Sequence, residues 1–102
     1  MVNKIMVKDI EEYLDKQSLE EVSSGHIFEA MCEVIVEKNE DYKLENLVEE
    51  YRASDVDDPS KFIESKIDNV LSEEIKYVIT ISNYHSWIDS TLFGFRDYGV
   101  NI

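Results

Sequence analysis

Apolar side chains recur three and four positions apart through most of this chain, a spacing that is typical of amphipathic helices. The pattern starts near Val7 and Ile10, and short polar segments interrupt it further along the chain. These interruptions divide the chain into pieces of helical length. The predicted helices cover about 10–16, 19–38, 44–51 and 59–71. Ser23, Ser24 and Gly25 interrupt the second pattern, which leaves open a division of this helix into two.

Several of these helices carry sequence signals at their ends. Asp9 is placed to cap the first helix by accepting hydrogen bonds from free backbone N–H groups. Ser18 begins a capping-box arrangement, so the second helix is expected to start there and to end near Asn39. Asp58 followed by Pro59 is the clearest start signal, because proline at the first helical position loses no hydrogen bond.

The local pattern after residue 75 is ambiguous. Ile75, Tyr77, Ile79 and Ile81 alternate as in a strand, whereas helical spacing also continues from Ile75 to Leu92. A strand here would need a partner, and an isolated two-stranded hairpin is only marginally stable. The expected fold is therefore an all-α bundle of four to five helices. The alternative is an α+β fold with a C-terminal β-hairpin from about residue 75.

The length of the chain fits one domain, residues 1–102, with 43% hydrophobic residues to fill a core. Cys32 is the only cysteine, which leaves no internal disulfide and favours a reducing compartment. The sequence shows no signal peptide and no apolar run as long as a membrane span. We therefore expect a cytoplasmic protein of a bacterium, or of the host cytoplasm if a phage encodes it.

The net charge is confined to one half of the sequence. Residues 9–58 hold seventeen Asp and Glu against four Lys and Arg, which accounts for the whole net charge of −13. Nucleic acids and anionic membranes repel such a surface, so neither is expected as a direct partner. The partners that it would attract are basic proteins.

Carboxylates recur at helical spacing within this acidic half. Glu29, Glu33 and Glu37 are four residues apart, which places neighbours about 6 Å apart along a helix axis. Like charges at this spacing cost a few tenths of a kcal/mol per pair, and no lysine four residues on offsets them. The expected partner-binding residues are these and neighbouring acids, with two tyrosines as interface anchors: Glu29, Glu33, Glu37, Glu40, Asp41, Tyr42, Glu45, Glu49, Glu50, Tyr51, Asp55 and Asp57.

A second set of acids, Asp41, Glu45 and Glu49, repeats the same spacing. The simpler interpretation of such residues is a solvated face that only keeps the protein soluble. The one-sided distribution of charge favours a surface that docks on a basic site, because solubility alone does not require the acids to be gathered in one half.

No motif for catalysis or for a cofactor is present. A calcium loop starting at Asp55 would need a glutamate at its twelfth position, where the chain has Lys66. His26, Cys32 and His85 are too few and too scattered for a zinc site. We therefore expect no catalytic residues, no metal and no cofactor, and a protein that is not an enzyme.

Together these features predict a small acidic inhibitor or immunity-type protein that blocks a basic, nucleic-acid-acting protein, its carboxylates standing in for phosphates. The target would be a bacterial toxin such as a nuclease, or a host defence or DNA-binding protein. Bacterial immunity proteins and phage anti-defence inhibitors are similar in size and charge. The alternative is a helical structural or dimerisation subunit, such as a homodimer, that uses its C-terminal third. Seven of the eleven aromatic residues lie from Pro59 onward.

Overall fold

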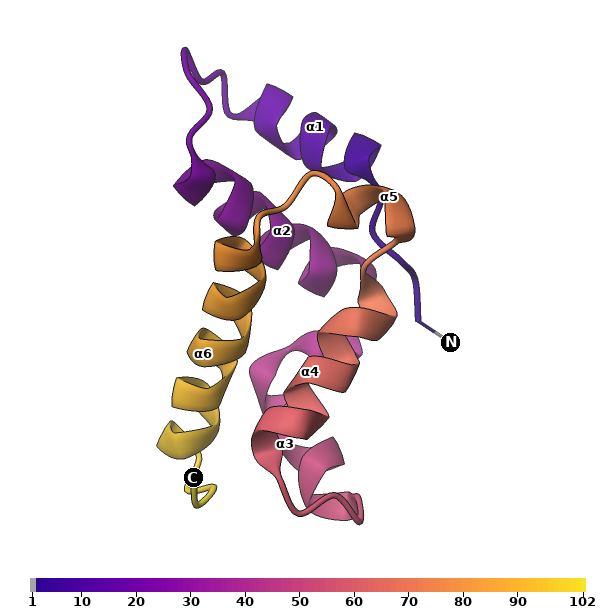
Figure 1. The fold of residues 1–102 in the computed structure, drawn as a ribbon, viewed down its shortest axis with the longest axis vertical. Coiled ribbons are helices and arrows are strands. Elements are labelled where there is room, and N and C mark those ends of the chain that lie inside the picture. Colours follow the sequence, from indigo (N-terminus) through magenta and orange to yellow (C-terminus); the bar gives the residue numbers. More distant parts are fainter. Residues whose placement is uncertain (1) are drawn as a thin grey trace.

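The structure is a computed structural model that describes residues 2–102. Its fold is built from helices joined by loops and turns (Figure 1). The elements are α1 (Val7–Lys16), α2 (Ser24–Lys38), the 3₁₀-helix η1 (Glu40–Tyr42), α3 (Leu44–Ala53), α4 (Pro59–Val70), α5 (Glu73–Lys76) and α6 (Ile81–Asp97). Residues 2–102 contain no strand, and their only β pairing is an isolated bridge between Ile5 and Leu71. The all-α prediction is confirmed, with more helices than the four to five expected.

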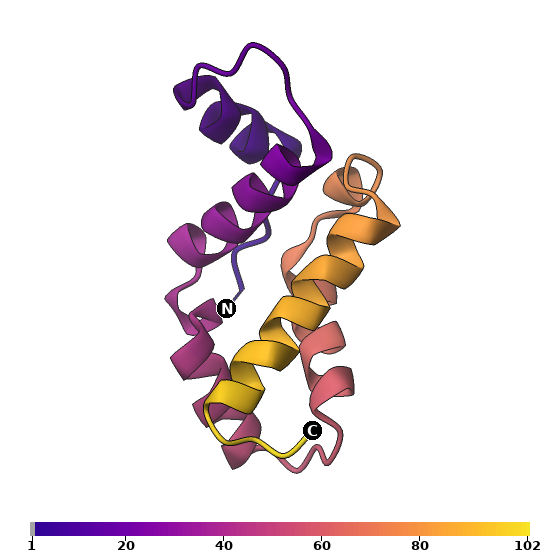
Figure 2. The same cartoon turned by 90° about the vertical axis from the view of Figure 1, so that its left-hand side faces the viewer.

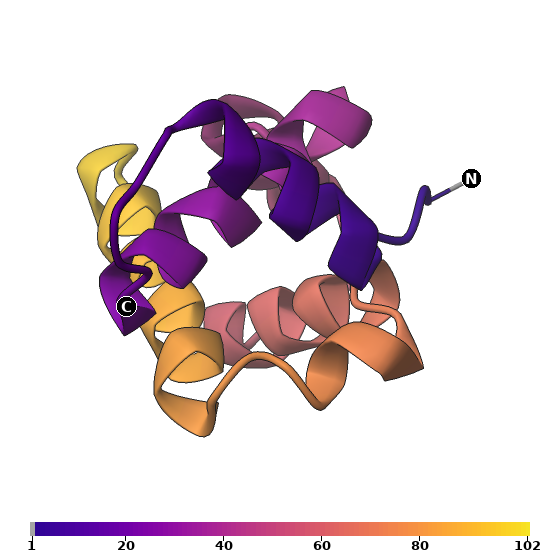
Figure 3. The same cartoon turned by 90° about the horizontal axis from the view of Figure 1, so that it is seen from above.

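The helices form two layers that follow the two halves of the sequence. α1, α2 and α3 lie on one side of the molecule, and α4, α5 and α6 lie on the other (Figures 2 and 3). α6 joins the layers, because it packs against α4 and also against α2 and α3. The molecule is elongated, with extents of 43 × 26 × 21 Å. No helix in the described range 2–102 combines the length and the apolar character that a membrane span requires.

The core lies between the two layers, where each helix turns its apolar face inward. Three aromatic rings meet where α3, α4 and α6 come together. Phe95 of α6 is fully buried, and its ring centroid lies 5.7 Å from that of Tyr51 in α3 and 6.4 Å from that of Phe62 in α4. Burial of such rings supplies much of the driving force for joining the layers.

The N-terminal segment also links the layers. Ile5 donates its backbone N–H to the carbonyl of Val70 at 2.9 Å and accepts from the N–H of Ser72 at 3.3 Å. Ile5 and Leu71 are both fully buried at this bridge. The start of the chain is thereby held at the junction of α4 and α5.

Two of the predicted helix ends are confirmed and one is wrong. The Asp58 carboxylate accepts from the N–H of Ser60 at 3.0 Å, with Pro59 as the first residue of α4. Asn39 follows the last residue of α2, as expected. Asp9, however, is the third residue of α1, where its carboxylate accepts from the N–H of Met6 at 2.8 Å. It stabilises the start of the helix from inside rather than as the cap.

The predicted helix start at Ser18 is also wrong. Ser18 adopts a left-handed backbone conformation, with φ of 53°, in the turn that follows α1. α2 begins at Ser24, because Ser23 caps it by accepting from the N–H of His26 at 3.3 Å. The His26 ring reaches back to the N–H of Ser23 at 3.1 Å and completes this cap. The reciprocal pair of Ser23 and His26 is the cap that forms, and the segment from Ser18 to Ser23 is a loop.

The strand alternative for residues 75–81 is wrong as well. The Ser72 hydroxyl caps the short helix α5 by accepting from the N–H of Ile75 at 3.2 Å, and a turn leads from α5 to α6. Ile75 and Ile79 are buried four residues apart, whereas Tyr77 is 91% exposed. The strand-like alternation of apolar residues from Ile75 to Ile81 therefore comes from one helical turn followed by a loop.

Candidate protein-binding surface

The acidic half of the sequence becomes one layer of the molecule. Residues 9–58 contain nearly all of α1 and the whole of α2, η1 and α3, which lie together on one side (Figure 2). This layer carries the net charge of −13. The charge asymmetry along the chain is thus an asymmetry across the fold.

The first row of carboxylates lies on the outer face of α2. Glu29, Glu33 and Glu37 are exposed, whereas the opposite face of the helix is buried in the core through Ala30, Met31, Val34 and Ile35. Helical periodicity produces this division, because the acids and the core residues occupy alternate faces of the same helix. The sequence prediction that these three side chains face solvent is confirmed.

The row of α2 lies close to Tyr13 of α1. Burial raises the pKa of the Tyr13 hydroxyl, and the carboxylates of Glu29, Glu33 and Glu37 raise it further. Each of the three negative charges disfavours a phenolate in its neighbourhood. All three carboxylates therefore act on one small region, where α1 packs against α2.

The second set of acids, together with Glu40 before it, is exposed but does not form a continuous helical row. Glu40 and Asp41 lie on η1, and Glu45 and Glu49 lie on α3, with all four side chains exposed. Lys43 has an extended backbone between the two elements, so helical spacing holds only from Glu45 to Glu49. The side-chain amide of Asn46 donates to the carbonyl of Glu40 at 2.9 Å and ties η1 to α3.

We define the acidic surface as the seven exposed acids of α2, η1 and α3: Glu29, Glu33, Glu37, Glu40, Asp41, Glu45 and Glu49. Within residues 2–102 none of the seven is in an ion pair. The acids of this half that are paired lie elsewhere, with Lys38 3.2 Å from Asp9 and Lys66 2.6 Å from Glu50. Within residues 2–102 the charge of the acidic surface is therefore not compensated by ion pairs, whereas the charge of Glu50 is.

Tyr42 and Tyr51 are not the surface anchors that the sequence predicted. Tyr42 is 3% exposed, and its hydroxyl donates to the carbonyl of Lys66 at 2.8 Å. Tyr51 packs its ring against Phe62 and donates its hydroxyl to the carbonyl of Asp57 at 3.0 Å. Both tyrosines hold the acidic layer against α4, because a tyrosine ring suits a core whenever its hydroxyl finds an acceptor.

Asp55 and Asp57 lie in the exposed loop between α3 and α4. The loop is fixed by backbone contacts at both ends, since the Ser54 hydroxyl donates to the carbonyl of Tyr51 at 2.7 Å and Asp58 caps α4. In the described part of the chain, no group of three or more His, Cys, Asp and Glu side chains is placed to hold a metal ion.

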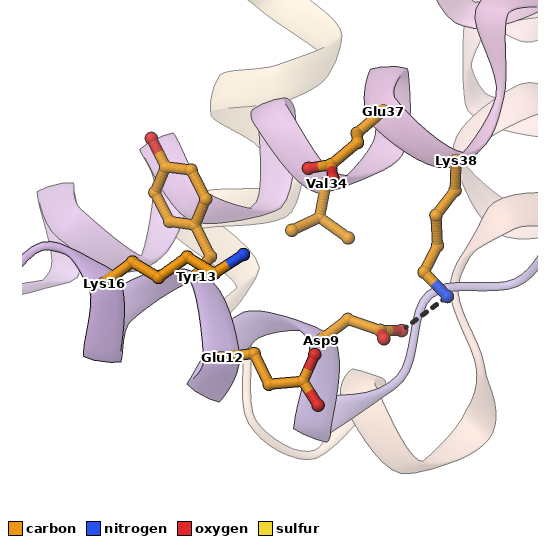
Figure 4. A pocket seen from close by; sticks show the side chains of 7 residues that line it. All are labelled: Asp9, Glu12, Tyr13, Lys16, Val34, Glu37 and Lys38. Atoms are coloured by element: carbon orange, nitrogen blue, oxygen red, sulfur yellow. Dashed lines mark ion pairs between the residues drawn. The ribbon is translucent and has the colours of Figure 1, made fainter.

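A groove between α1 and α2 extends the charged region, and sequence analysis missed it. It has a volume of about 90 Å³ and is lined by Asp9, Glu12, Tyr13, Lys16, Val34, Glu37 and Lys38 (Figure 4). The ion pair of Asp9 and Lys38 closes one end, as the dashed line in Figure 4 shows. The signal in the sequence was the spacing of Asp9, Tyr13 and Lys16, which places all three on the face of α1 that meets α2.

Replacing Glu29, Glu33 and Glu37 together with glutamine should stabilise the fold. The change removes two repulsive pairs at i, i+4 and keeps side chains of similar helix propensity, for a gain of about 0.5–1 kcal/mol in the free energy of unfolding. The melting temperature measured by circular dichroism should rise by about 2–6 °C at low salt, and by less at high salt. A lower melting temperature would show that these carboxylates make stabilising contacts.

The thiol of Cys32 reports on the same surface. Burial raises its pKa to about 11, and the carboxylates of Glu33 and Glu29 contribute. At pH 8 we expect alkylation about 100-fold slower than that of an unstructured cysteine, because the thiolate is the reactive form. The glutamine variant should react faster than wild type at pH values below about 11. Equal rates would place the thiol outside the field of these carboxylates.

The raised pKa of Cys32 also affects stability at high pH. The unfolded thiol, with a pKa near 9.0, loses its proton before the folded one does. The stabilising contribution is therefore complete below pH 9.0 and is lost as the pH rises through about 11. Chemical denaturation of wild type and a Cys32→Ser variant across this range measures the difference.

The acidic surface thus spans three consecutive elements, α2, η1 and α3, and all seven of its carboxylates are exposed. Comparisons with known protein families, with curated proteins and with solved structures find no match to this chain.

Proposed function

We propose that this chain is a small non-enzymatic inhibitor that binds a basic, nucleic-acid-acting protein, such as a toxin nuclease or a DNA-binding host protein, and blocks its nucleic-acid site. The observation that carries the proposal is the acidic surface, whose seven carboxylates are exposed and lack ion pairs within residues 2–102. Lys and Arg side chains that normally hold phosphates would pair with these carboxylates. Binding would then exclude the nucleic acid by occupancy.

The acids at the C-terminal end of α2 destabilise the free protein, which supports a binding role for these acids. Glu37 lies in the last turn of α2, and Glu40 and Asp41 follow its C-terminal end. Negative charge at a helix C-terminus is unfavourable, because the helix dipole already gives that end a partial negative charge. A basic partner relieves this repulsion on binding.

The surface is held rigidly, which lowers the entropic cost of binding. η1 cannot move freely, because the buried Tyr42 joins it to α4 and the backbone N–H of Tyr42 donates to the carbonyl of Asn39 at 2.9 Å. Long-range attraction to a basic partner would speed association, and both rate and affinity would fall as salt rises.

The test is affinity capture followed by binding measurements with the captured protein. A bacterial lysate is passed over the immobilised chain, and the captured basic protein is then titrated with wild type and with the Glu29/Glu33/Glu37→Gln variant. We expect binding to weaken about 10- to 100-fold in this variant, with steep salt dependence in wild type. A DNA oligonucleotide should displace the chain, because both occupy the same site.

The matched control removes three acids from the other layer. Glu64, Glu73 and Glu74 are exposed on α4 and α5, so a Glu64/Glu73/Glu74→Gln variant has the same net charge as the test variant. Binding by this control should stay near the wild-type value. Equal weakening of both variants would mean that only total charge matters, and simultaneous binding of DNA and the chain would exclude the blocking mechanism.

A further inference from the structure

α6 lies along the outside of the molecule and leaves a long face uncovered in the described residues (Figure 2). Ile81 and Phe93, at opposite ends of this face, are 77% and 63% exposed. Between them, one helical turn apart, lie the exposed polar side chains of His85 and Asp89. The outer row of α6 is thus Ile81, His85, Asp89 and Phe93, with apolar ends and a polar middle.

A hollow lies beside each apolar end of this row. The hollow at Ile81 has a volume of about 220 Å³ and is lined by Asp68, Lys76, Ile79, Thr80, Ile81 and Tyr84. The hollow at Phe93 has a volume of about 230 Å³ and is lined by Asp89, Leu92, Phe93, Arg96 and Ile102. Each end of the row therefore offers both a protruding apolar side chain and a place to receive one.

The row is complementary to itself when it is reversed. An antiparallel copy of α6, related by a two-fold axis at the level of Trp87, brings Ile81 of one chain to Phe93 of the other and His85 to Asp89. A two-fold interface has this isologous form, in which each contact occurs twice. We propose that two copies of this chain form a homodimer through antiparallel α6 helices, with Ile81 and Phe93 seated in the partner's hollows and His85 hydrogen-bonded to the partner's Asp89.

The charge distribution selects this face for self-association. Two acidic layers repel one another, since residues 9–58 carry the whole net charge of −13. Residues 59–102 hold six acids and four bases, so the α6 side is the part of the molecule where two copies approach with the least repulsion. The dimer leaves both acidic layers facing outward.

Helix packing also suits the arrangement. Rows of residues four apart form ridges, and two such ridges lie parallel when helices pack at the crossing angle most common in globular proteins. A contact of one helix pair is small, so the expected dissociation constant is on the order of 1–100 μM.

Sedimentation of the full chain over a range of concentrations tests the proposal. Wild type should shift from monomer to dimer, and Ile81→Asp and Phe93→Asp should each weaken the dimer by about tenfold or more. Val22→Asp is the control, because Val22 is an exposed apolar residue of the acidic half. It should leave the dissociation constant unchanged. Circular dichroism confirms that each variant is folded, as expected for exposed sites.

Salt gives a second readout. Screening of the net negative charge should strengthen the dimer as salt rises, which is the opposite of the salt dependence proposed for the basic partner. Failure of one proposal is therefore distinguishable from failure of the other.

Mixing two variants tests the antiparallel pairing itself. His85→Asp places two carboxylates opposite each other in its own dimer, and Asp89→Lys loses the acceptor for His85. In a mixed dimer, the new Asp meets the new Lys across the two-fold axis, so mixed dimers should exceed both homodimers. Wild type that stays monomeric at about 1 mM, a concentration far above the expected dissociation constant, would overturn the dimer. Equal weakening by Val22→Asp, or no preference for mixed dimers, would overturn the α6 interface.

Discussion

Replacing Phe95 with alanine should lower the free energy of unfolding by about 3–5 kcal/mol, the cost of removing a large aromatic side chain from a core. Phe95 is fully buried, and it contacts α3 through Tyr51 and α4 through Phe62. The substitution opens a cavity where both layers meet, so neither layer can fill it by a local shift. Since small domains have only about 5–15 kcal/mol of stability, the variant should be close to unfolding at physiological temperature. Urea denaturation measures the loss.

The control for this prediction lies two residues away on the same helix. Phe93→Ala removes the same ring from an exposed position of α6, and its effect on monomer stability should stay within about 0.5 kcal/mol. Equal losses for Phe93 and Phe95 would contradict the orientation of α6. A loss of less than about 1 kcal/mol for Phe95→Ala would mean that the core is loosely packed at this point.

The all-α fold was predictable because strong local signals agree with the tertiary structure. Asp58 and Pro59 fix the start of α4 whatever surrounds them, since capping and the missing proline N–H are local effects. The start of α2 was not predictable from Ser18, because two serine caps competed within a few residues. Ser23 prevails in the structure, where His26 completes its hydrogen bonds.

In the candidate site too, features set by local sequence were predictable, and features set by contacts between helices were not. The exposure of Glu29, Glu33 and Glu37 followed from helical spacing against a buried face. The places of Tyr42 and Tyr51 did not, because a tyrosine serves equally well in an interface and in a core with an acceptor for its hydroxyl. Nor did the sequence show that Glu50 has a partner, since Lys66 comes from another helix.

The two-layer arrangement explains how one small chain can carry opposite surface properties. Within residues 2–102, no lysine or arginine forms an ion pair with the acids of the acidic surface. The layer of α4 to α6 has most of the exposed large apolar side chains. Charge and apolar contact are thereby separated across the core. A basic partner and a second copy of the chain would use different faces and need not compete.

Asn39 connects the N-terminal segment to the C-terminal end of α2, and substitutions of Asn39 should be the most damaging after Phe95→Ala. Its side chain is buried. Its oxygen accepts from the N–H of Asn3 at 2.8 Å, and its amide donates to the carbonyls of Asn3 at 2.9 Å and of Ile35 at 3.3 Å. Asn39→Ala should cost about 2 kcal/mol, because these hydrogen bonds have no replacement within the fold.

Asn39→Asp sharpens the prediction because it keeps the shape and changes only the hydrogen-bonding character. The carboxylate still accepts from the N–H of Asn3, but it faces the two carbonyls that the amide served, so the loss should be about 3 kcal/mol or more. Asn69→Ala, at an exposed position of α4, should change stability by less than about 0.5 kcal/mol. Hydrogen exchange at the amide of Ile5, which donates to Val70, should quicken in both Asn39 variants as the N-terminal segment detaches. Unchanged exchange at Ile5 would show that the Ile5–Leu71 bridge holds this segment without Asn39.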